Sequence, residues 1–260
     1  MGEEIEFYAK YADIYELQFA HISDDVEFWV KLAKRFPKPV LELACGTGRI
    51  TIPIARAGIR ITGLDASREM LRVFKKKLEK EDSEVRRCVS LKLGDMRDFD
   101  FKERFGFIFI PFSSFLHLTS VEDEEKCLRA IHRNLKRGGV LVIDVFKPNF
   151  RKFPEGTLRV DLSRVDKAMG LKITRLSSRT YEHPKQLIHA KFYLDVVSEQ
   201  GKARRYTTGF TLRYIKDAKE MKELLERCGF RLERIYGNYS FGPFTPLSSK
   251  MIFVARKGRL

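Results

Sequence analysis

The amino-acid sequence predicts an α/β fold, in which a doubly wound, mostly parallel sheet carries an inserted antiparallel β layer and an N-terminal helical segment. Three observations lead to this prediction. Strand and helix patterns alternate from residue 39 to residue 146 and resume near residue 217. Between these regions, residues 157–215 alternate apolar and polar side chains instead. The chain has 260 residues and 43% hydrophobic content, which is enough for one large domain with an insertion.

The first 35 residues are expected to form two helices. In the first, four aromatic residues recur at spacings of three and four and therefore share one face: Phe7, Tyr8, Tyr11 and Tyr15. Ser23 with Asp24 can start the second helix, and Pro37 and Pro39 end the segment.

The region from residue 39 to residue 146 is expected to contain five strands and three helices. The strands are expected at 39–45, 60–65, 89–95, 105–112 and 138–146, and the helices at 49–58, 67–81 and 121–136. Gly58 terminates the first of these helices, and Ser67 is the expected N-cap of the second. Strictly alternating units of this length predict a parallel sheet with helices on both faces.

Residues 157–215 are expected to form three or four antiparallel strands inserted after the fifth strand. The stretch SEQGK at 198–202 is a hairpin turn signal. A helix from Asp217 to Gly229 and strands at 231–239 and 249–256 then complete the main sheet. Residues 151–215 hold 14 Lys or Arg and 6 Asp or Glu, about half of the positive excess of the chain.

The net charge of +15 has two explanations. One is a nucleic-acid or other anionic partner. The other is the surface of a thermophile protein, because Asn and Gln occur three times each while Lys, Arg and Glu are abundant. The spacing of the four cysteines indicates a reduced chain with no metal site. The chain has no run of about 18 apolar residues and no signal-peptide pattern, so a cytoplasmic protein that does not bind membranes is expected.

The first strand leads into a glycine-containing turn, LELACGTGRI at 41–50. Gly46 and Gly48 allow the backbone to approach a ligand closely, because a Cβ there would collide with it. A phosphate-binding P-loop needs a Lys after the second glycine, and a dinucleotide-binding turn needs a third glycine where Thr51 stands. Glu42 would repel phosphates and instead suits a cationic ligand, such as a sulfonium that carries an α-ammonium group.

Acidic residues stand at the tips of three successive predicted strands, and Glu42 is the first of them. Asp65 ends the second strand, 19 residues after Gly46, and can accept hydrogen bonds from both hydroxyls of a ribose. Asp95 ends the third strand and can accept an adenine amino hydrogen, while the backbone N–H of Met96 can reach a ring nitrogen. Each acid alone could cap a helix or lie in a solvated loop, but the three together indicate a positively charged nucleoside.

Four segments resemble successive motifs of the class I S-adenosylmethionine-dependent methyltransferases: LELACGTGR, ITGLDASREML, LKLGDMRDF and LKRGGVLVIDVF. The resemblance is strong over 38–147 and weaker over 217–257. It implies a seven-stranded sheet with an antiparallel last strand, and S-adenosylmethionine as the cofactor. Glu42 and Gly46 would hold the methionine end, Asp65 the ribose, and Asp95 with Met96 the adenine. The full set expected to bind the cofactor is Tyr11, Glu42, Ala44, Gly46, Gly48, Asp65, Ala66, Met70, Gly94, Asp95, Met96 and Pro111.

The resemblance also divides the chain by role. Residues 1–37 are expected to form a helical lid, residues 38–150 with 216–260 the cofactor-binding domain, and residues 151–215 a substrate-side layer. Four aromatic residues are expected to face the acceptor: Tyr8, Tyr15, Tyr239 and Phe241.

The acceptor is expected at the end of the fourth strand. Family members that methylate base or amide nitrogens carry [ND]-P-P-[YFW] there, whereas this chain has IPFS at 110–113, which disfavours a planar amino acceptor. His117 is the candidate general base, with a packing role as the alternative, and Ser114 is a candidate to orient the acceptor.

The sequence therefore predicts a methyltransferase that acts by in-line displacement on a small molecule. The positive excess of residues 151–215 points to an anionic acceptor, although a solvated outer sheet face would also explain those charges. An RNA or tRNA methyltransferase and a non-catalytic protein that binds S-adenosylmethionine are the alternatives.

Overall fold

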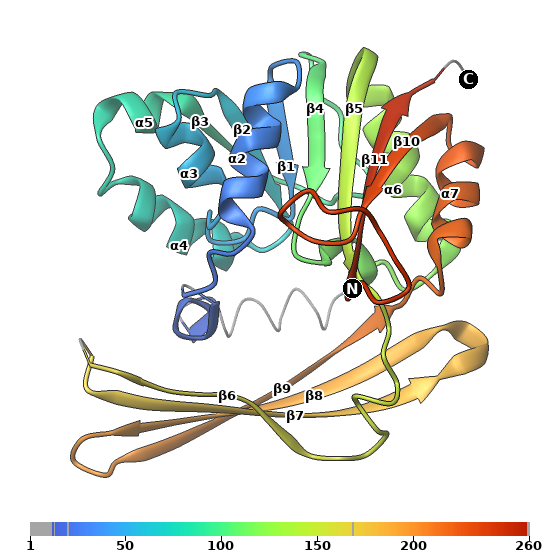
Figure 1. Cartoon of the computed structure of the whole chain (residues 1–260). Coiled ribbons are helices and arrows are strands. Elements are labelled where there is room, and N and C mark those ends of the chain that lie inside the picture. Colours follow the sequence, from blue (N-terminus) through green and yellow to red (C-terminus); the bar gives the residue numbers. More distant parts are fainter. Residues whose placement is uncertain (1–11, 13, 20, 168, 259–260) are drawn as a thin grey trace.

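The computed structural model describes residues 12–258 apart from 13, 20 and 168. The chain forms two layers, with a helix-covered seven-stranded sheet, sheet A, above a curved four-stranded sheet, sheet B (Figure 1). Of the predicted N-terminal helix, residues 14–19 are described and are helical. Phe7, Tyr8 and Tyr11 lie outside the described residues.

Sheet A has the strand order β10-β11-β5-β4-β1-β2-β3. Its strands are β1 (Val40–Leu43), β2 (Ile61–Asp65), β3 (Val89–Leu93), β4 (Phe105–Ile110), β5 (Leu135–Phe146), β10 (Phe230–Tyr236) and β11 (Lys250–Lys257). Strands β1 to β5 pair in parallel, and β11 pairs antiparallel with both β5 and β10. The predicted seven strands and antiparallel last strand are thus confirmed. The carboxyl ends of β1 to β5 share the edge that faces sheet B (Figure 1).

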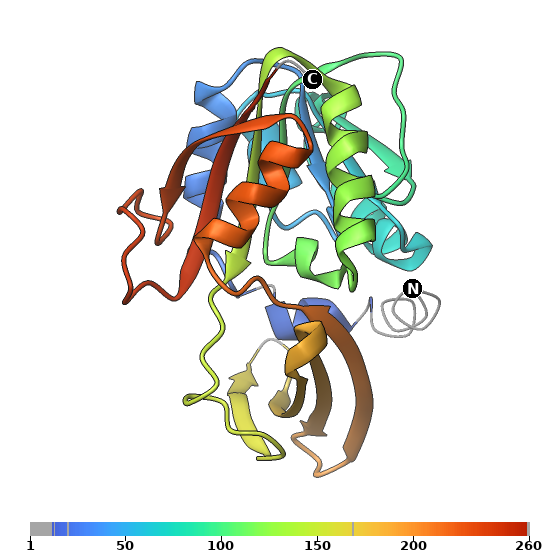
Figure 2. The same cartoon turned by 90° about the vertical axis from the view of Figure 1, so that its right-hand side faces the viewer.

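Helices cover both faces of sheet A, as Figure 2 shows from the side. They are α2 (Val26–Arg35), α3 (Thr51–Arg56), α4 (Arg68–Leu78), α5 (Ser83–Cys88), α6 (Val121–Asn134) and α7 (Ala218–Arg227). Trp29 of α2 and Ile54 of α3 share a fully buried core with Phe109 of β4, while α6 and α7 pack on the opposite face. Ser67 accepts a hydrogen bond from the Met70 backbone N–H at 3.2 Å, so the predicted N-cap of α4 is confirmed.

Sheet B has the order β6-β7-β8-β9 and every neighbouring pair is antiparallel. Its strands are β6 (Arg159–Asp166), β7 (Leu171–Glu182), β8 (Leu187–Ser198) and β9 (Ala203–Arg213), and the short helix η2 (His183–Lys185) joins β7 to β8. The predicted turn at 198–202 joins β8 to β9. The sheet enters after β5 and returns to α7, so the inserted antiparallel layer is confirmed.

A buried ion cluster fixes the end of sheet B to the helices of sheet A. Arg213, the last residue of β9, donates to both carboxylate oxygens of Glu124 in α6 at 2.8 Å and to Glu220 in α7 at 2.6 Å. Gln186 donates to the same Glu220 carboxylate at 2.9 Å. The Arg213 side chain is 7% exposed and that of Glu124 is fully buried, so this contact is a rigid joint between the two layers.

Candidate active site

One cavity of about 1330 Å³ lies between the carboxyl edge of sheet A and the inner face of sheet B. Sequence-predicted residues that line it are Ala44, Gly46, Asp65, Ala66, Met70, Gly94, Asp95, Met96, Ser114, His117 and Tyr15. Met70 lies in the first turn of α4, Tyr15 comes from the N-terminal segment, and the others belong to the strand tips, loops and short helix at the edge of sheet A. The parallel sheet therefore brings most of the predicted site residues together at one place.

The turn after β1 is held open by Asp65. The Asp65 carboxylate at the tip of β2 accepts the backbone N–H of Gly46 at 2.7 Å and that of Ser67 at 2.8 Å. Gly46 has φ +54°, and a Cβ on it would meet no atom of the described residues within 4 Å; because Gly46 lines the cavity, a side chain there would enter it. At Gly48 the constraint is steric, because a Cβ there would lie 2.5 Å from the Phe74 ring and would clash with it.

Asp95 follows β3 and lies beside Arg97. Arg97 donates to Asp95 at 2.7 Å and to Asp123 at 2.8 Å. Burial raises the pKa of the Asp95 carboxyl, but the hydrogen bonds and charge of Arg97 outweigh that effect and lower it below its usual value. Asp95 is therefore ionised and available as a hydrogen-bond acceptor at neutral pH.

Glu42 lies in β1 and is 2% exposed, so it does not line the cavity. It accepts a short hydrogen bond from the Thr51 hydroxyl. Burial raises the pKa of Glu42 to about 8 and that of Asp65 above its usual value. Both carboxylates would be favoured in their ionised form by a nearby cation.

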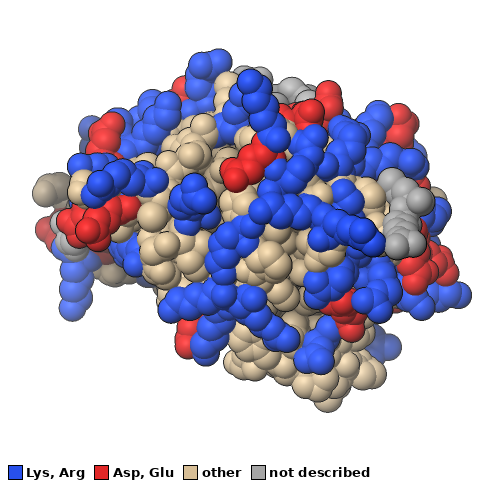
Figure 3. All heavy atoms as spheres, turned by 90° about the horizontal axis from the view of Figure 1, so that it is seen from above, with Lys and Arg blue, Asp and Glu red and all other residues tan. Residues whose placement is uncertain are grey.

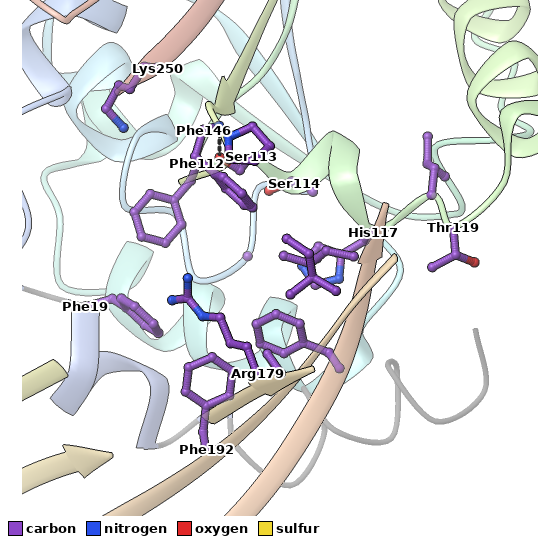
Figure 4. A pocket seen from close by; sticks show the side chains of 18 of the residues that line it. Phe19, Phe112, Ser113, Ser114, His117, Thr119, Phe146, Arg179, Phe192 and Lys250 are labelled. Atoms are coloured by element: carbon purple, nitrogen blue, oxygen red, sulfur yellow. Dashed lines mark hydrogen bonds between the residues drawn. The ribbon is translucent and has the colours of Figure 1, made fainter. Parts of the chain in front are cut away.

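The chain after β4 turns through two left-handed residues, Phe112 with φ +57° and Ser113 with φ +60°. Buried Asp144 at the end of β5 holds this turn: its carboxylate accepts the Phe112 N–H at 3.2 Å and its carbonyl accepts the Ser113 N–H at 3.1 Å. The Ser113 hydroxyl accepts the Phe146 N–H at 3.0 Å, the dashed bond in Figure 4. The turn leads into the short helix η1 (Ser114–His117), whose Ser114 and His117 line the pocket (Figure 4).

Four other predicted site residues do not line the cavity: Gly48, Pro111, Tyr239 and Phe241. Tyr239 donates to the Asp144 carboxylate at 2.6 Å, and Phe241 packs on Phe28 with ring centroids 4.7 Å apart. Pro111 precedes the left-handed turn outside the lining. The loop between β10 and β11 does lie at the ligand edge, as expected, but residues 246–250 wall the cavity instead.

Residues 14–19 bridge the two layers. Glu16 accepts from Thr47 at 2.5 Å and pairs with Lys77 at 2.9 Å, which ties the segment to the glycine turn and to α4. On the other side, the Leu17 carbonyl accepts from Arg164 of β6. The Tyr15 ring contacts Phe19 with centroids 4.6 Å apart, and both side chains line the cavity.

The inner face of sheet B supplies lining residues that the sequence did not single out. They are Arg175, Arg179 and Tyr181 of β7, Ile188, Ala190 and Phe192 of β8, and Thr208, Phe210 and Leu212 of β9. Each set has a spacing of two or four, so one face of every strand points inward. This alternation was visible in the sequence, but which face packs toward sheet A was not.

The part of the cavity at sheet A fits S-adenosylmethionine. Asp65 and Asp95 offer carboxylates at adjacent strand tips, and Gly46 leaves room for a ligand against the backbone. Within the described residues, no group of three or more His, Cys, Asp or Glu could hold a metal ion. No helix among the described residues is long and apolar enough to cross a membrane. The fold and this site define an enzyme that uses a nucleoside cofactor.

Comparisons with known proteins identify the reaction class. Residues 40–139 match the family model described as a methyltransferase domain. The cypemycin N-terminal methyltransferase of a Streptomyces species is 26% identical over 220 residues, covering 85% of this chain and 83% of that protein. The dTDP-3-amino-3,4,6-trideoxy-alpha-D-glucopyranose N,N-dimethyltransferase of Streptomyces venezuelae is 25% identical over 238 residues, covering 88% and 94%. The solved CcbJ methyltransferase from Streptomyces caelestis has a TM-score of 0.82 at 22% identity and covers 96% of both chains. Residues 40–139 therefore form a methyltransferase domain that uses S-adenosylmethionine, and the chain has the fold of the class I methyltransferases.

Proposed function

We propose that the enzyme methylates an amine nitrogen of a small anionic molecule bound between sheet A and sheet B. The observation that carries this proposal is the single cavity that joins the acid-tipped edge of sheet A to the inner face of sheet B, with His117 on its wall. One relative named above is described as an N-terminal methyltransferase, and the other as an N,N-dimethyltransferase of a dTDP-linked amino sugar.

The residues of the sheet A edge take the roles expected from the resemblance. Asp65 would hold the ribose hydroxyls, and Asp95 with the Met96 N–H would hold the adenine. Bound S-adenosylmethionine supplies a methyl carbon on a sulfonium leaving group. Positioning of the acceptor in line with that carbon can supply most of the acceleration, so the walls of the cavity do the main catalytic work.

A general base is required because an amine arrives protonated at neutral pH. His117 lies in η1, directly after the left-handed turn, and its ring centroid is 5.2 Å from that of Phe210 in sheet B. It lines the same cavity as Asp65 on the sheet A side and Phe210 on the sheet B side. We assign His117 as the base that removes the amine proton, and Ser114 beside it as a hydrogen-bonding group for the acceptor.

The charge of the cavity wall supports an anionic acceptor. Five lining side chains of sheet B and the segment before it are cationic, Lys147, Arg151, Lys152, Arg175 and Arg179, and Lys250 at the start of β11 adds a sixth. Asp161 is the single carboxylate among the described lining residues of that part. This surplus faces the acceptor, so it is distinct from charges on the outer faces.

An RNA acceptor is less consistent with the distribution of charge. Figure 3 shows Lys and Arg spread over the face seen from above, which carries the amino ends of the parallel strands in Figure 1. The cavity opens at the opposite end of those strands. A polyanion bound on this basic face would lie far from the methyl donor.

The test is a turnover assay on the purified chain with S-adenosylmethionine and a panel of amines, matched in size and carrying either a carboxylate, a phosphate or no charge. Formation of S-adenosylhomocysteine is followed by chromatography. His117→Gln should lower kcat about 10²–10⁴-fold and remove the acidic limb of the pH profile, with S-adenosylhomocysteine affinity unchanged. Equal kcat and an unaltered pH profile in this variant would exclude His117 as the base. Turnover of tRNA but of none of the amines would exclude the small-molecule proposal.

A further inference from the structure

A row of aromatic rings runs from the candidate base to Arg175, a partly buried arginine. The centroids of His117 and Phe210 are 5.2 Å apart, and those of Phe210 and Phe192 are 5.0 Å apart in a stacked arrangement. The guanidinium carbon of Arg175 lies 5.8 Å from the Phe192 centroid and 5.2 Å from that of Phe19. Figure 4 shows Phe19, Phe192 and Arg179 on the side of the pocket opposite Phe112 and Ser114.

The strand register explains how the row forms. In β8 and β9, Phe192 lies opposite Thr208 and Ala190 lies opposite Phe210, so the two rings are diagonal neighbours on one face. Ser177 of β7 lies opposite Phe192, which places Arg175 and Arg179 one inward position to either side. Ala190, Phe192 and Phe210 all line the cavity.

Arg175 carries a charge that its neighbours satisfy only in part. Its side chain is 18% exposed, and its Nε is buried without a hydrogen-bond partner among the described residues. The nearest carboxylate oxygen, on Asp161, is 3.8 Å away, and the Gln18 side-chain oxygen is 3.5 Å from the other end of the guanidinium. Both distances exceed those of strong charge-assisted hydrogen bonds.

Burial lowers the pKa of Arg175, the charge of Asp161 opposes this shift, and the nearby charge of Arg179 adds to it. Two guanidinium groups on one wall therefore disfavour each other. Because arginine stays protonated in proteins, the free enzyme keeps the unfavourable free energy of desolvation and charge repulsion at Arg175. A bound anion would reduce this unfavourable free energy.

We propose that Arg175, with Arg179 beside it, binds an oxyanion of the acceptor while Phe192 and Phe210 pack against the body of the same molecule. The inference rests on the proposed function and names its specificity determinants. The acceptor it describes has an amine at the His117 end, a flat or apolar body, and a carboxylate or phosphate at the Arg175 end. A planar guanidinium fork matches both oxyanions, and aromatic faces favour planar rings and the apolar faces of sugars.

The test measures binding rather than turnover. Phenyl phosphate and benzoate are titrated calorimetrically into the enzyme saturated with S-adenosylhomocysteine, with benzamide as the uncharged analogue. At least one of the two anions should bind at least tenfold more tightly than benzamide, and their ranking distinguishes a phosphate from a carboxylate. Arg175→Met should weaken the preferred anion at least tenfold, and Arg175→Lys should weaken it less.

Arg204→Gln is the matched control, since it removes one charge from an exposed position of the same sheet that does not line the cavity. It should bind the anions as the wild type does. Equal anion affinity in Arg175→Met, or an equal loss in Arg204→Gln, would overturn the proposal. If Arg175→Met does not fold, Arg175→Lys and Phe192→Leu decide the matter, because both must weaken binding of the preferred anion. Failure of the proposed function would give a different result. Anion binding would then still depend on Arg175, but the enzyme would methylate none of the amines.

Discussion

Replacement of Asp65 by alanine tests the cofactor site most directly. The carboxylate accepts two backbone N–H groups in the free protein, from Gly46 at 2.7 Å and Ser67 at 2.8 Å. Its remaining lone pairs face the cavity edge, where the ribose hydroxyls are expected. Asp65→Ala therefore removes ligand contacts and also releases the turn that shapes the site.

The magnitude follows from the hydrogen bonds involved. A bond to a charged acceptor contributes about 1.5–3 kcal/mol, and 1.4 kcal/mol corresponds to a tenfold change in affinity. Loss of two ribose contacts should then weaken S-adenosylhomocysteine binding by roughly 100-fold or more. Asp65→Asn should weaken S-adenosylhomocysteine binding less, because the amide keeps one oxygen acceptor. Some loss should remain, because the NH₂ group of the amide would face a backbone N–H that the carboxylate had accepted.

Calorimetric titration with S-adenosylhomocysteine measures the effect, and the thermal midpoint of the free protein reports on the turn. Ser90→Ala, in neighbouring β3 and outside the cavity lining, is a suitable control and should bind normally. A folded Asp65→Ala variant with wild-type affinity would refute the ribose assignment. A loss of affinity that is as large for adenine alone would show that the turn, rather than ribose recognition, is the main effect.

Two further predictions concern buried acids. The pKa of Glu42 is raised to about 8 by burial, so its contribution to stability is present below its unfolded value of 4.5 and is lost as the pH rises through 8. Glu42→Gln should flatten the fall in unfolding free energy between pH 6 and pH 9 by about 2 kcal/mol, as measured by urea titration at each pH, and parallel curves would contradict this. Arg213→Met leaves Glu124 buried without its partner and should cost about 3–5 kcal/mol in urea unfolding, whereas Arg213→Met with Glu124→Leu should recover most of it. Equal losses in the single and double variants would show that the charge of Glu124 is not the cause.

The cofactor-binding edge of sheet A was predictable because its residues follow directly after strands that the local sequence pattern identifies. Strand periodicity places Asp65 and Asp95 at neighbouring tips, and the same argument placed Glu42 among them. The sequence does not show how deeply each of these acidic side chains is buried. Glu42 lies within β1 beneath the turn, where it meets Thr51, because a four-residue strand ends one residue after it.

The acceptor side depended on tertiary contacts that no spacing reveals. The loop with Tyr239 was correctly placed at the ligand edge, but Asp144 draws the Tyr239 hydroxyl into the protein, away from the cavity. Conversely, the charged residues of β7 could be seen in the sequence. A strand with a solvated face and a strand with a ligand-facing face, however, have the same alternation of apolar and polar residues. Only the packing of sheet B against sheet A shows that Arg175 and Arg179 face inward.

The two halves of the cavity can change independently. Among the described lining residues, Asp65, Asp95, the glycines and the left-handed turn come from sheet A and its loops, while Phe192, Phe210, Arg175 and Arg179 come from sheet B. Arg213 joins the layers away from the cavity, whereas Gln18 and Phe19 of the N-terminal segment contact Arg175 on the inner face of sheet B. Substitutions at Phe192 or Arg175 can therefore alter which acceptor binds without moving Asp65. This separation gives a physical reason for chains of similar sequence, such as the two methyltransferases named above, to be named for different acceptors.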